Sequence, residues 1–173
     1  MQTLGFFTFT PITSRGFSLI ELLVCLALMG SLAAFALPNW QRFQEARRIE
    51  AVRDQLITDL QTARLRALQR GEALQLARLS NCKWVTTSEN DWSCGWQLRL
   101  KADATVLQVT AIDTPIKVTF GKSMPFDISA RGDLGTVGER WVIQAIRITP
   151  SVAMTLCINS ASRVRWLAGE SCS

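Results

Sequence analysis

The sequence of 173 residues contains no histidine and no tyrosine. The lack of histidine excludes Ser-His-Asp and Cys-His catalysis, and it excludes a zinc site with histidine ligands. No two cysteines are spaced as C-x-x-C, which argues against a zinc ribbon or a thioredoxin-like redox site. Gly121-Lys122-Ser123 is not a phosphate-binding loop, because Ile116 stands where that loop needs its first glycine. An enzyme built from the remaining groups is possible but lacks the commonest general base, and we expect neither a cofactor nor a metal ion.

Charged residues are few, at 19%, whereas apolar residues make up 48% of the chain. This balance is typical of a folded protein and argues against disorder. The formal net charge of +5 permits contact with nucleic acid or anionic lipid but does not require it. The length fits one membrane segment plus one small domain, or one ordinary domain.

One long apolar run stands out near the N-terminus. Residues 17–37 read FSLIELLVCLALMGSLAAFAL and contain a single charge, Glu21. As a helix this run would be about 32 Å long, which is enough to cross the hydrocarbon core of a bilayer. Arg15 precedes the run and no basic residue follows it immediately, which places the N-terminus in the cytoplasm. The run predicts a single transmembrane helix.

The carboxylate of Glu21 makes this run unusual. A secretory signal peptide would carry its charge before the apolar core. A simple membrane anchor would avoid a carboxylate, because burying one in the bilayer costs a few kcal/mol. A soluble core helix is rarely apolar all round over such a length. Glu21 is therefore predicted to be functional and to need a cationic partner.

The segment Arg15-Gly16-Phe17-Ser18-Leu19-Ile20-Glu21 resembles the prepilin cleavage and anchor motif of type IV pilins and type II secretion pseudopilins. The resemblance implies that residues 1–16 are a leader peptide, that prepilin peptidase cuts between Gly16 and Phe17, and that the new Phe17 amine is methylated. It also implies that Glu21 pairs with the Phe17 amine of a neighbouring pilin or pseudopilin in a filament, where the pair neutralises both charges. The implied location is the inner membrane, with the C-terminal domain in the periplasm until assembly into a pilus or pseudopilus.

Residues 38–71 follow with the pattern of an amphipathic helix. Its apolar residues recur at spacings of three and four and predict a stripe that packs on a globular domain; they are Ile49, Val52, Leu56, Leu60, Ala63 and Ala67. The charged residues between them are of mixed sign, so we expect a solvated face rather than a track for DNA; they are Arg42, Glu45, Arg47, Arg48, Glu50, Arg53, Asp54, Asp59, Arg64, Arg66 and Arg70. A bend is expected near Pro38 and the end of the helix at Gly71.

Residues 72–173 change to short alternating or β-branched segments that predict strands. The expected strands are Leu74–Leu79, Trp96–Leu100, Val106–Ile112, Ile116–Phe120, Trp141–Thr149 and Met154–Ile158, with a loop at Phe126–Gly132. We interpret them as one antiparallel sheet, or two small sheets, packed on the helix stripe. The fold class is α+β, and the anchor motif makes it a type IV pilin-like fold.

The cysteines outside the apolar run could form disulfides outside the cytoplasm. Four cysteines permit three connectivities. A Cys82–Cys94 bridge would close a loop of about a dozen residues and contribute about 3 kcal/mol, and a Cys157–Cys172 bridge would pin the C-terminal tail. Cys25 lies in the apolar run and is expected to be inert.

Three tryptophans lie close to Cys82 and Cys94 in the sequence: Trp84, Trp92 and Trp96. They could stack on nucleic acid bases, but packing in the core or in a loop is the favoured interpretation.

Beyond the anchor, the chain resembles the FimT/GspH group of minor pilins and pseudopilins. The resemblance lies in Arg70-Gly71-Glu72, Cys94-Gly95-Trp96-Gln97-Leu98, the Phe126–Gly132 loop, Leu156-Cys157 and the tail Ser162-Arg163-Val164-Arg165. In FimT-like pilins the tail carries a Gly-Arg-x-Arg motif that binds DNA during natural transformation.

The resemblance implies that Arg163 and Arg165 are candidates for DNA binding, with Ser162 in place of the motif's glycine. Arginines at alternate positions of an extended segment point to the same side, where each can contact a phosphate. Trp166 next to them could stack on a base. The other interpretation is a basic, solvated turn.

We predict a minor pilin of a type IV pilus that acts in pilus assembly, with binding or uptake of double-stranded DNA as a candidate further role. The alternative is a minor pseudopilin of a type II protein secretion system. A membrane-anchored enzyme is disfavoured by the missing histidine and by the peptidase motif.

Overall fold

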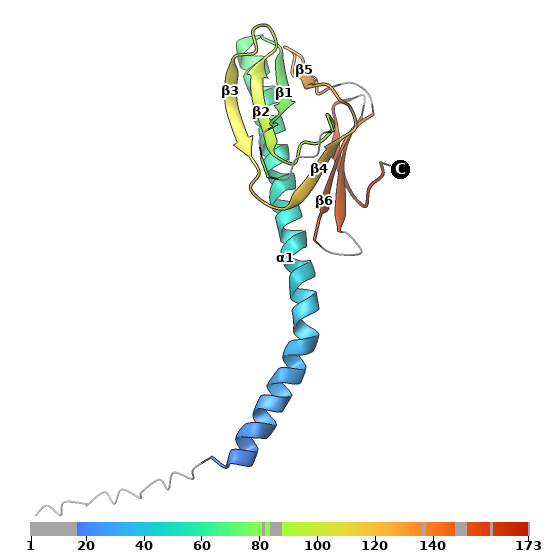
Figure 1. Ribbon diagram of the computed structural model, residues 1–173. Coiled ribbons are helices and arrows are strands. Elements are labelled where there is room, and N and C mark those ends of the chain that lie inside the picture. Colours follow the sequence, from blue (N-terminus) through green and yellow to red (C-terminus); the bar gives the residue numbers. More distant parts are fainter. Residues whose placement is uncertain are drawn as a thin grey trace, which may run out of the picture. The chain divides into compact units, whose positions relative to one another are not determined.

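The computed structural model describes residues 17–80, 82–83, 88–135, 138–147, 152–159 and 161–172, without the side chains of residues 35–39. It consists of two compact units, of which the first ends at Asn39 and the second begins at Trp40. The helix α1 (Leu19–Arg70) contributes to both units, and the strands belong to the second (Figure 1). The leader with Gly16, and also Trp84, lie outside the described residues.

The part of α1 within the second unit packs on the sheets through the predicted apolar stripe. Each of its six residues is at most 8% exposed, which confirms the prediction. The helix ends at Arg70, and Gly71 follows in the left-handed region at φ 66° with its N–H 2.9 Å from the Ala67 carbonyl. Glycine adopts this conformation without a steric cost, so the predicted stop is confirmed. The bend expected at Pro38 falls among the residues whose side chains are not described.

Two antiparallel four-stranded sheets complete the second unit, which confirms the interpretation of two small sheets. The first, sheet A, has the order β3-β2-β1-β5, with strands β1 (Leu74–Arg78), β2 (Gly95–Leu100), β3 (Val106–Ala111) and β5 (Phe126–Ile128). The second, sheet B, has the order β4-β6-β7-β8, with strands β4 (Ile116–Phe120), β6 (Glu139–Ala145), β7 (Ala153–Ile158) and β8 (Val164–Ala168). In Figure 1, β1, β2 and β3 run alongside the upper part of α1.

Two strands differ from the sequence prediction. Strand β5 begins where a loop was expected, because its three residues are too few to show a period of two. They pair with β1 through Leu74–Ile128, Gln75–Asp127 and Leu76–Phe126. Strand β8 was expected only as an extended tail, and it pairs with β7 along its whole length. The strand predicted at Trp141–Thr149 corresponds to β6, which begins at Glu139 and ends at Ala145. Its predicted last residue, Thr149, lies outside the described residues.

The core lies where the helix stripe meets the inner faces of both sheets. Its centre is aromatic: the Trp141 ring lies 4.4 Å from that of Phe120 and 4.7 Å from that of Phe126, centroid to centroid. Trp92 packs edge-on against Phe120 at 5.2 Å. Such pairs add about 0.5–1.5 kcal/mol each beyond the area they bury. Trp92 and Trp96 are each 1% exposed, so they pack in the core as the favoured interpretation held.

Two acids expected on the solvated face of α1 are buried instead. Asp59 is 4% exposed and accepts hydrogen bonds from four neutral donors, namely Trp96 Nε1 at 2.7 Å, Thr110 Oγ1 at 2.7 Å, Gln108 Nε2 at 2.9 Å and Gln55 Nε2 at 3.0 Å. Glu45 is 5% exposed and bonds Arg48 at 2.7 Å. Since buried polar groups need partners, Asp59 ties α1 to β2 and β3.

Candidate functional site

The predicted assembly region lies on the first turns of α1. Glu21 is an acid in the first turn of the helix, where the helix dipole favours a negative charge. Phe17 is 79% exposed, and every described side chain from residue 17 to residue 34 is exposed in the single chain. Glu21 makes no ion pair with any described residue of its own chain. The apolar helix and its acid are therefore open to a partner.

The predicted span at residues 17–37 includes residues 35–37, whose side chains are not described. Among the described residues, no helix is both long enough and apolar enough to count as a membrane span.

The two candidate DNA-binding arginines lie on one side of the edge strand β8. Arg165 is within the strand and pairs with Cys157 of β7, and Arg163 directly precedes the strand. Both are exposed, and the residue between them, Val164, is half-buried against the core. Because side chains alternate between the two faces of a strand, both guanidinium groups point to solvent on the same side, as was expected for an extended segment.

A tight turn before β8 positions Arg163. The Arg163 N–H donates to Asn159 Oδ1 at 2.9 Å, and the Asn159 N–H donates to the Arg163 carbonyl at 3.1 Å. Ser162 sits in this turn at φ 54°, a left-handed conformation that favours glycine. Its hydroxyl accepts a hydrogen bond from the Leu134 N–H at 3.0 Å. The serine in place of the motif's glycine thus keeps a glycine-like backbone and links the turn to the segment after β5.

Trp166 does not join the two arginines. It points to the opposite face of β8, half-buried against the core, and its buried Nε1 has no hydrogen-bond partner among the described residues. The guanidinium of Arg53 from α1 lies 5.9 Å from its ring centroid. Stacking of Trp166 on a base bound beside Arg165 is incompatible with this orientation, because neighbouring residues of a strand face opposite sides.

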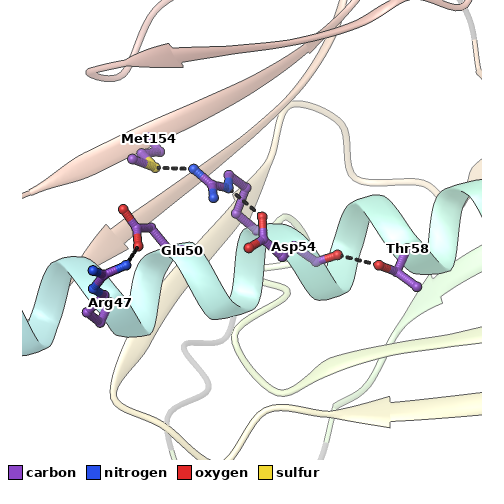
Figure 2. A network of polar contacts seen from close by, with 6 residues as sticks. Arg47, Glu50, Asp54, Thr58 and Met154 are labelled. Atoms are coloured by element: carbon purple, nitrogen blue, oxygen red, sulfur yellow. Dashed lines mark hydrogen bonds and ion pairs between the residues drawn. The ribbon is translucent and has the colours of Figure 1, made fainter.

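Arg53 of α1 contacts both its helix neighbour Asp54 and Met154 of β7, and these two partners are labelled in Figure 2. Its Nε donates to Asp54 Oδ1 at 2.8 Å and its Nη1 approaches Met154 Sδ at 3.8 Å. The hydrogen bond to Asp54 raises the pKa of Arg53, and burial acts against it. This arginine is therefore turned towards its own chain and is not part of a free basic surface.

Strand register adds a third arginine that the sequence did not single out. Arg140 of β6 pairs with Cys157 of β7, which pairs in turn with Arg165 of β8. Arg140 and Arg165 are thus two strand spacings apart, about 10 Å, on the outer face of sheet B. No acid occupies an outward position of the strands of sheet B. The other residues at these outward positions are Lys117 and Thr119 of β4, Val142 and Gln144 of β6, Ala153 and Thr155 of β7 and Leu167 of β8. Only the pairing of distant strands reveals this third arginine.

Both disulfides considered in the sequence analysis are present. Cys82 is bonded to Cys94 with the Cα atoms 5.4 Å apart, and Cys157 is bonded to Cys172 with the Cα atoms 5.9 Å apart. Cys25 is free and exposed. The second bridge starts from Cys157, between Arg140 and Arg165, and Thr155 Oγ1 donates to the Gly169 carbonyl at 2.6 Å. The C-terminal tail is therefore held against the outer face of sheet B beside the arginines.

The described residues contain no cluster of histidine, cysteine, aspartate or glutamate that could hold a metal ion.

Comparison with known proteins identifies two sequence families along the chain. Residues 13–37 match the prokaryotic N-terminal methylation motif, and residues 53–164 match the family of the type II transport protein GspH. No curated protein matches the chain significantly.

The fold is similar to that of the type IV minor pilin FimU of Pseudomonas aeruginosa. One crystal form of FimU matches with a TM-score of 0.59 at 19% identity, over 76% of this chain and 99% of FimU. A second crystal form gives a TM-score of 0.56 at 20% identity, over 72% and 99% of the two chains. At this identity the likeness establishes the fold alone. It confirms the predicted α+β fold of the type IV pilin class.

Proposed function

The chain belongs to the GspH family of type II transport proteins, and from this premise we propose that it is a minor pilin of a type IV pilus, processed by prepilin peptidase. The observation that carries the proposal is the order of the two matches: a methylation motif over residues 13–37 precedes a GspH domain over residues 53–164. Both lie on one chain with a pilin fold. We propose no catalytic activity, cofactor or metal ion for it.

The proposed maturation step is hydrolysis of the bond between Gly16 and Phe17, followed by methylation of the new amine. The apolar helix of residues 17–37 then holds the subunit in the inner membrane, with the second unit in the periplasm, until the subunit enters a filament. In the filament Glu21 pairs with the Phe17 amine of a neighbouring pilin. The open surroundings of Glu21 in the single chain support this role, because a carboxylate in an apolar bundle requires a counter-charge.

Mass spectrometry of the protein purified from membranes tests the maturation step. We expect the mature chain to begin at Phe17 with a methylated amine, and we expect Gly16→Val to leave the leader attached. A matched control, Gly30→Val, changes a glycine of α1 that has open space around its Cβ position and leaves cleavage unchanged. A wild-type membrane protein that still starts at Met1 would overturn the assignment.

We further propose that the outer face of sheet B binds the backbone of double-stranded DNA through Arg163, Arg165 and Arg140. The candidate arginines are exposed and no outward strand position holds an acid. The tail held on this face adds one acid, Glu170, against three arginines and Lys117, so the local charge stays positive, and contacts to phosphate depend on net positive charge at close range. Trp166 is left out because it faces the core. Binding of this kind is independent of base sequence and sensitive to salt.

Gel shift of the mature chain in detergent tests the DNA surface. The variant Arg163→Ala/Arg165→Ala should bind more weakly and reduce the slope of log affinity against log salt by about 2, since each lost phosphate contact removes about 0.9. The control Arg66→Ala/Arg70→Ala removes two arginines of α1 and should bind as the wild type does. Unchanged binding by the first variant would remove the arginine pair from the site.

The alternative function is a minor pseudopilin of a type II secretion system, which the name of the matched family favours. A deletion strain separates the two functions. If the deletion strain loses pili and DNA uptake but secretes exoproteins normally, the protein is a pilin. If the strain has normal pili but its exoproteins stay in the periplasm, the protein is a pseudopilin.

A further inference from the structure

Exposed aromatic side chains gather at the start of the second unit. Trp40 is 59% exposed and Phe43 is 50% exposed, with their ring centroids 6.0 Å apart. The guanidinium of Arg47 lies 5.0 Å from the Phe43 ring centroid. Because these residues are three and four positions apart, they share one face of α1. Trp40, Phe43 and Arg47 are called the aromatic collar below.

The collar plays no part in the core of the second unit. Neither aromatic residue belongs to the buried cluster or to the half-buried residues packed on it. Two large aromatic side chains that stay in water do not gain the favourable free energy of burial, which is large for aromatic residues in cores and interfaces. Tryptophan with an adjoining basic residue is instead typical of a membrane surface, where an apolar ring can sit below a hydrated head group.

The position of the collar in the chain fits that surface. Trp40 is the third residue after Leu37, the end of the predicted membrane span, and a helix rises about 5 Å over three residues. The head-group layer is about 5–7 Å thick on each side of the hydrocarbon core. The backbone of Phe43 lies about 9 Å beyond Leu37, just outside that layer. Side chains on a helix lean towards its N-terminus, so the Phe43 ring reaches back towards the layer and lies 6.0 Å from the Trp40 ring, and the Arg47 side chain reaches back towards Phe43.

The charges around the collar suit the phosphate of a phospholipid head group. Glu50 is bonded to Arg47 at 3.0 Å (Figure 2), and Glu45 is bonded to Arg48 at 2.7 Å. Arg42 is exposed and makes no ion pair with any described residue. A zwitterionic or anionic head group offers a phosphate to Arg42, while the boundary between the ester groups and the acyl chains accepts the two rings.

We propose that the aromatic collar seats the chain on the periplasmic surface of the inner membrane, with phospholipid head groups as its partner. The collar fixes how deeply the anchor sits and holds the second unit at the bilayer surface before assembly. The inference rests on the proposed membrane anchor and goes beyond it, because the anchor itself requires only residues 17–37.

Quenching of tryptophan fluorescence by brominated lipid tests the collar. The mature full chain is placed in nanodiscs that hold a single chain each, made of phosphatidylethanolamine and phosphatidylglycerol with bromine on the upper part of the acyl chains. We expect quenching in the wild type and loss of most of it in Trp40→Phe. The matched control Trp166→Phe also removes one tryptophan, from sheet B, and should keep the quenching.

The outcomes separate the collar from the anchor. A chain that elutes with the nanodiscs but shows the same quenching in the wild type and in Trp40→Phe would overturn the collar and leave the anchor intact. A chain that does not elute with nanodiscs would overturn both. Quenching that disappears only when a second pilin subunit is added would still support the collar, with the neighbouring subunit displacing lipid during assembly.

Discussion

Two carboxylates on the same helix have opposite surroundings. Asp59 is buried in the second unit and accepts four hydrogen bonds from its own chain. Glu21 is exposed in the first unit and has no ion-pair partner among the described residues. A carboxylate whose hydrogen-bond donors lie in its own chain stabilises the fold of the monomer. A carboxylate whose partner must come from another chain stabilises only an assembly. The comparison predicts that the two acids affect different measurements.

The largest expected effect is that of Asp59→Ala on folding. The change leaves the Trp96 N–H and the Thr110 hydroxyl without their acceptor, and we expect a loss of about 3–4 kcal/mol in the free energy of unfolding. Urea unfolding of the mature chain in detergent, followed by tryptophan fluorescence, measures it. The control Asp54→Ala removes an acid whose side chain is 61% exposed and should change stability by less than about 0.5 kcal/mol. Equal effects of the two variants would contradict the proposed tie between α1 and sheet A.

Leucines extend the same contrast to the apolar face of the helix. Leu56 is fully buried, so Leu56→Ala should cost about 3 kcal/mol in unfolding free energy. Leu26 is 58% exposed in the single chain, and Leu26→Ala should leave the stability of the second unit unchanged. The same urea unfolding applies to both. A large loss from Leu26→Ala would mean that the first unit takes part in the folding of the second.

Glu21→Ala should have the reverse profile of Asp59→Ala. We expect normal cleavage after Gly16 and normal urea unfolding, but incorporation into sheared filaments reduced about tenfold or more, since the Phe17 amine of a neighbour loses its charge partner. Immunoblots of filament and membrane fractions measure this ratio. The conservative variant Glu21→Asp should restore part of it. Normal incorporation of Glu21→Ala would refute the pairing.

The smallest expected effect concerns a third acid, Asp103, which is fully exposed. The Thr105 N–H donates to its carboxylate at 3.0 Å, and this hydrogen bond lowers the pKa of Asp103 below the ordinary value of 3.8. A lowered pKa stabilises the folded chain above pH 3.8, and that contribution is lost as pH falls through the folded pKa. NMR titration should show Asp103 protonating below 3.8. Asp103→Asn should remove this small pH dependence, and a carboxyl that titrates above 3.8 would contradict the hydrogen bond.

Local sequence determined the features that depend on spacing along the chain. The prepilin motif around Gly16 and Glu21, the apolar stripe of α1 and its end at Gly71 were all predictable, because cleavage motifs, helix periodicity and left-handed caps are local properties. Most strands were predictable for the same reason. The spacing of Asp59 was also compatible with burial, because it lies three residues after Leu56 and four before Ala63 and so falls on the same helix face as the stripe.

Tertiary structure decided what depends on residues far apart in the sequence. Three of the four donors to Asp59 come from β2 and β3, 37 to 51 residues away, so the sequence around Asp59 gave no sign of the partners that allow its burial. Strand register placed Arg140 on the same face as Arg165, two strands away, and the pairing of β8 with β7 turned Trp166 towards the core. Non-local pairing sets which face of a strand is outward, and no pattern within a single strand encodes its neighbours.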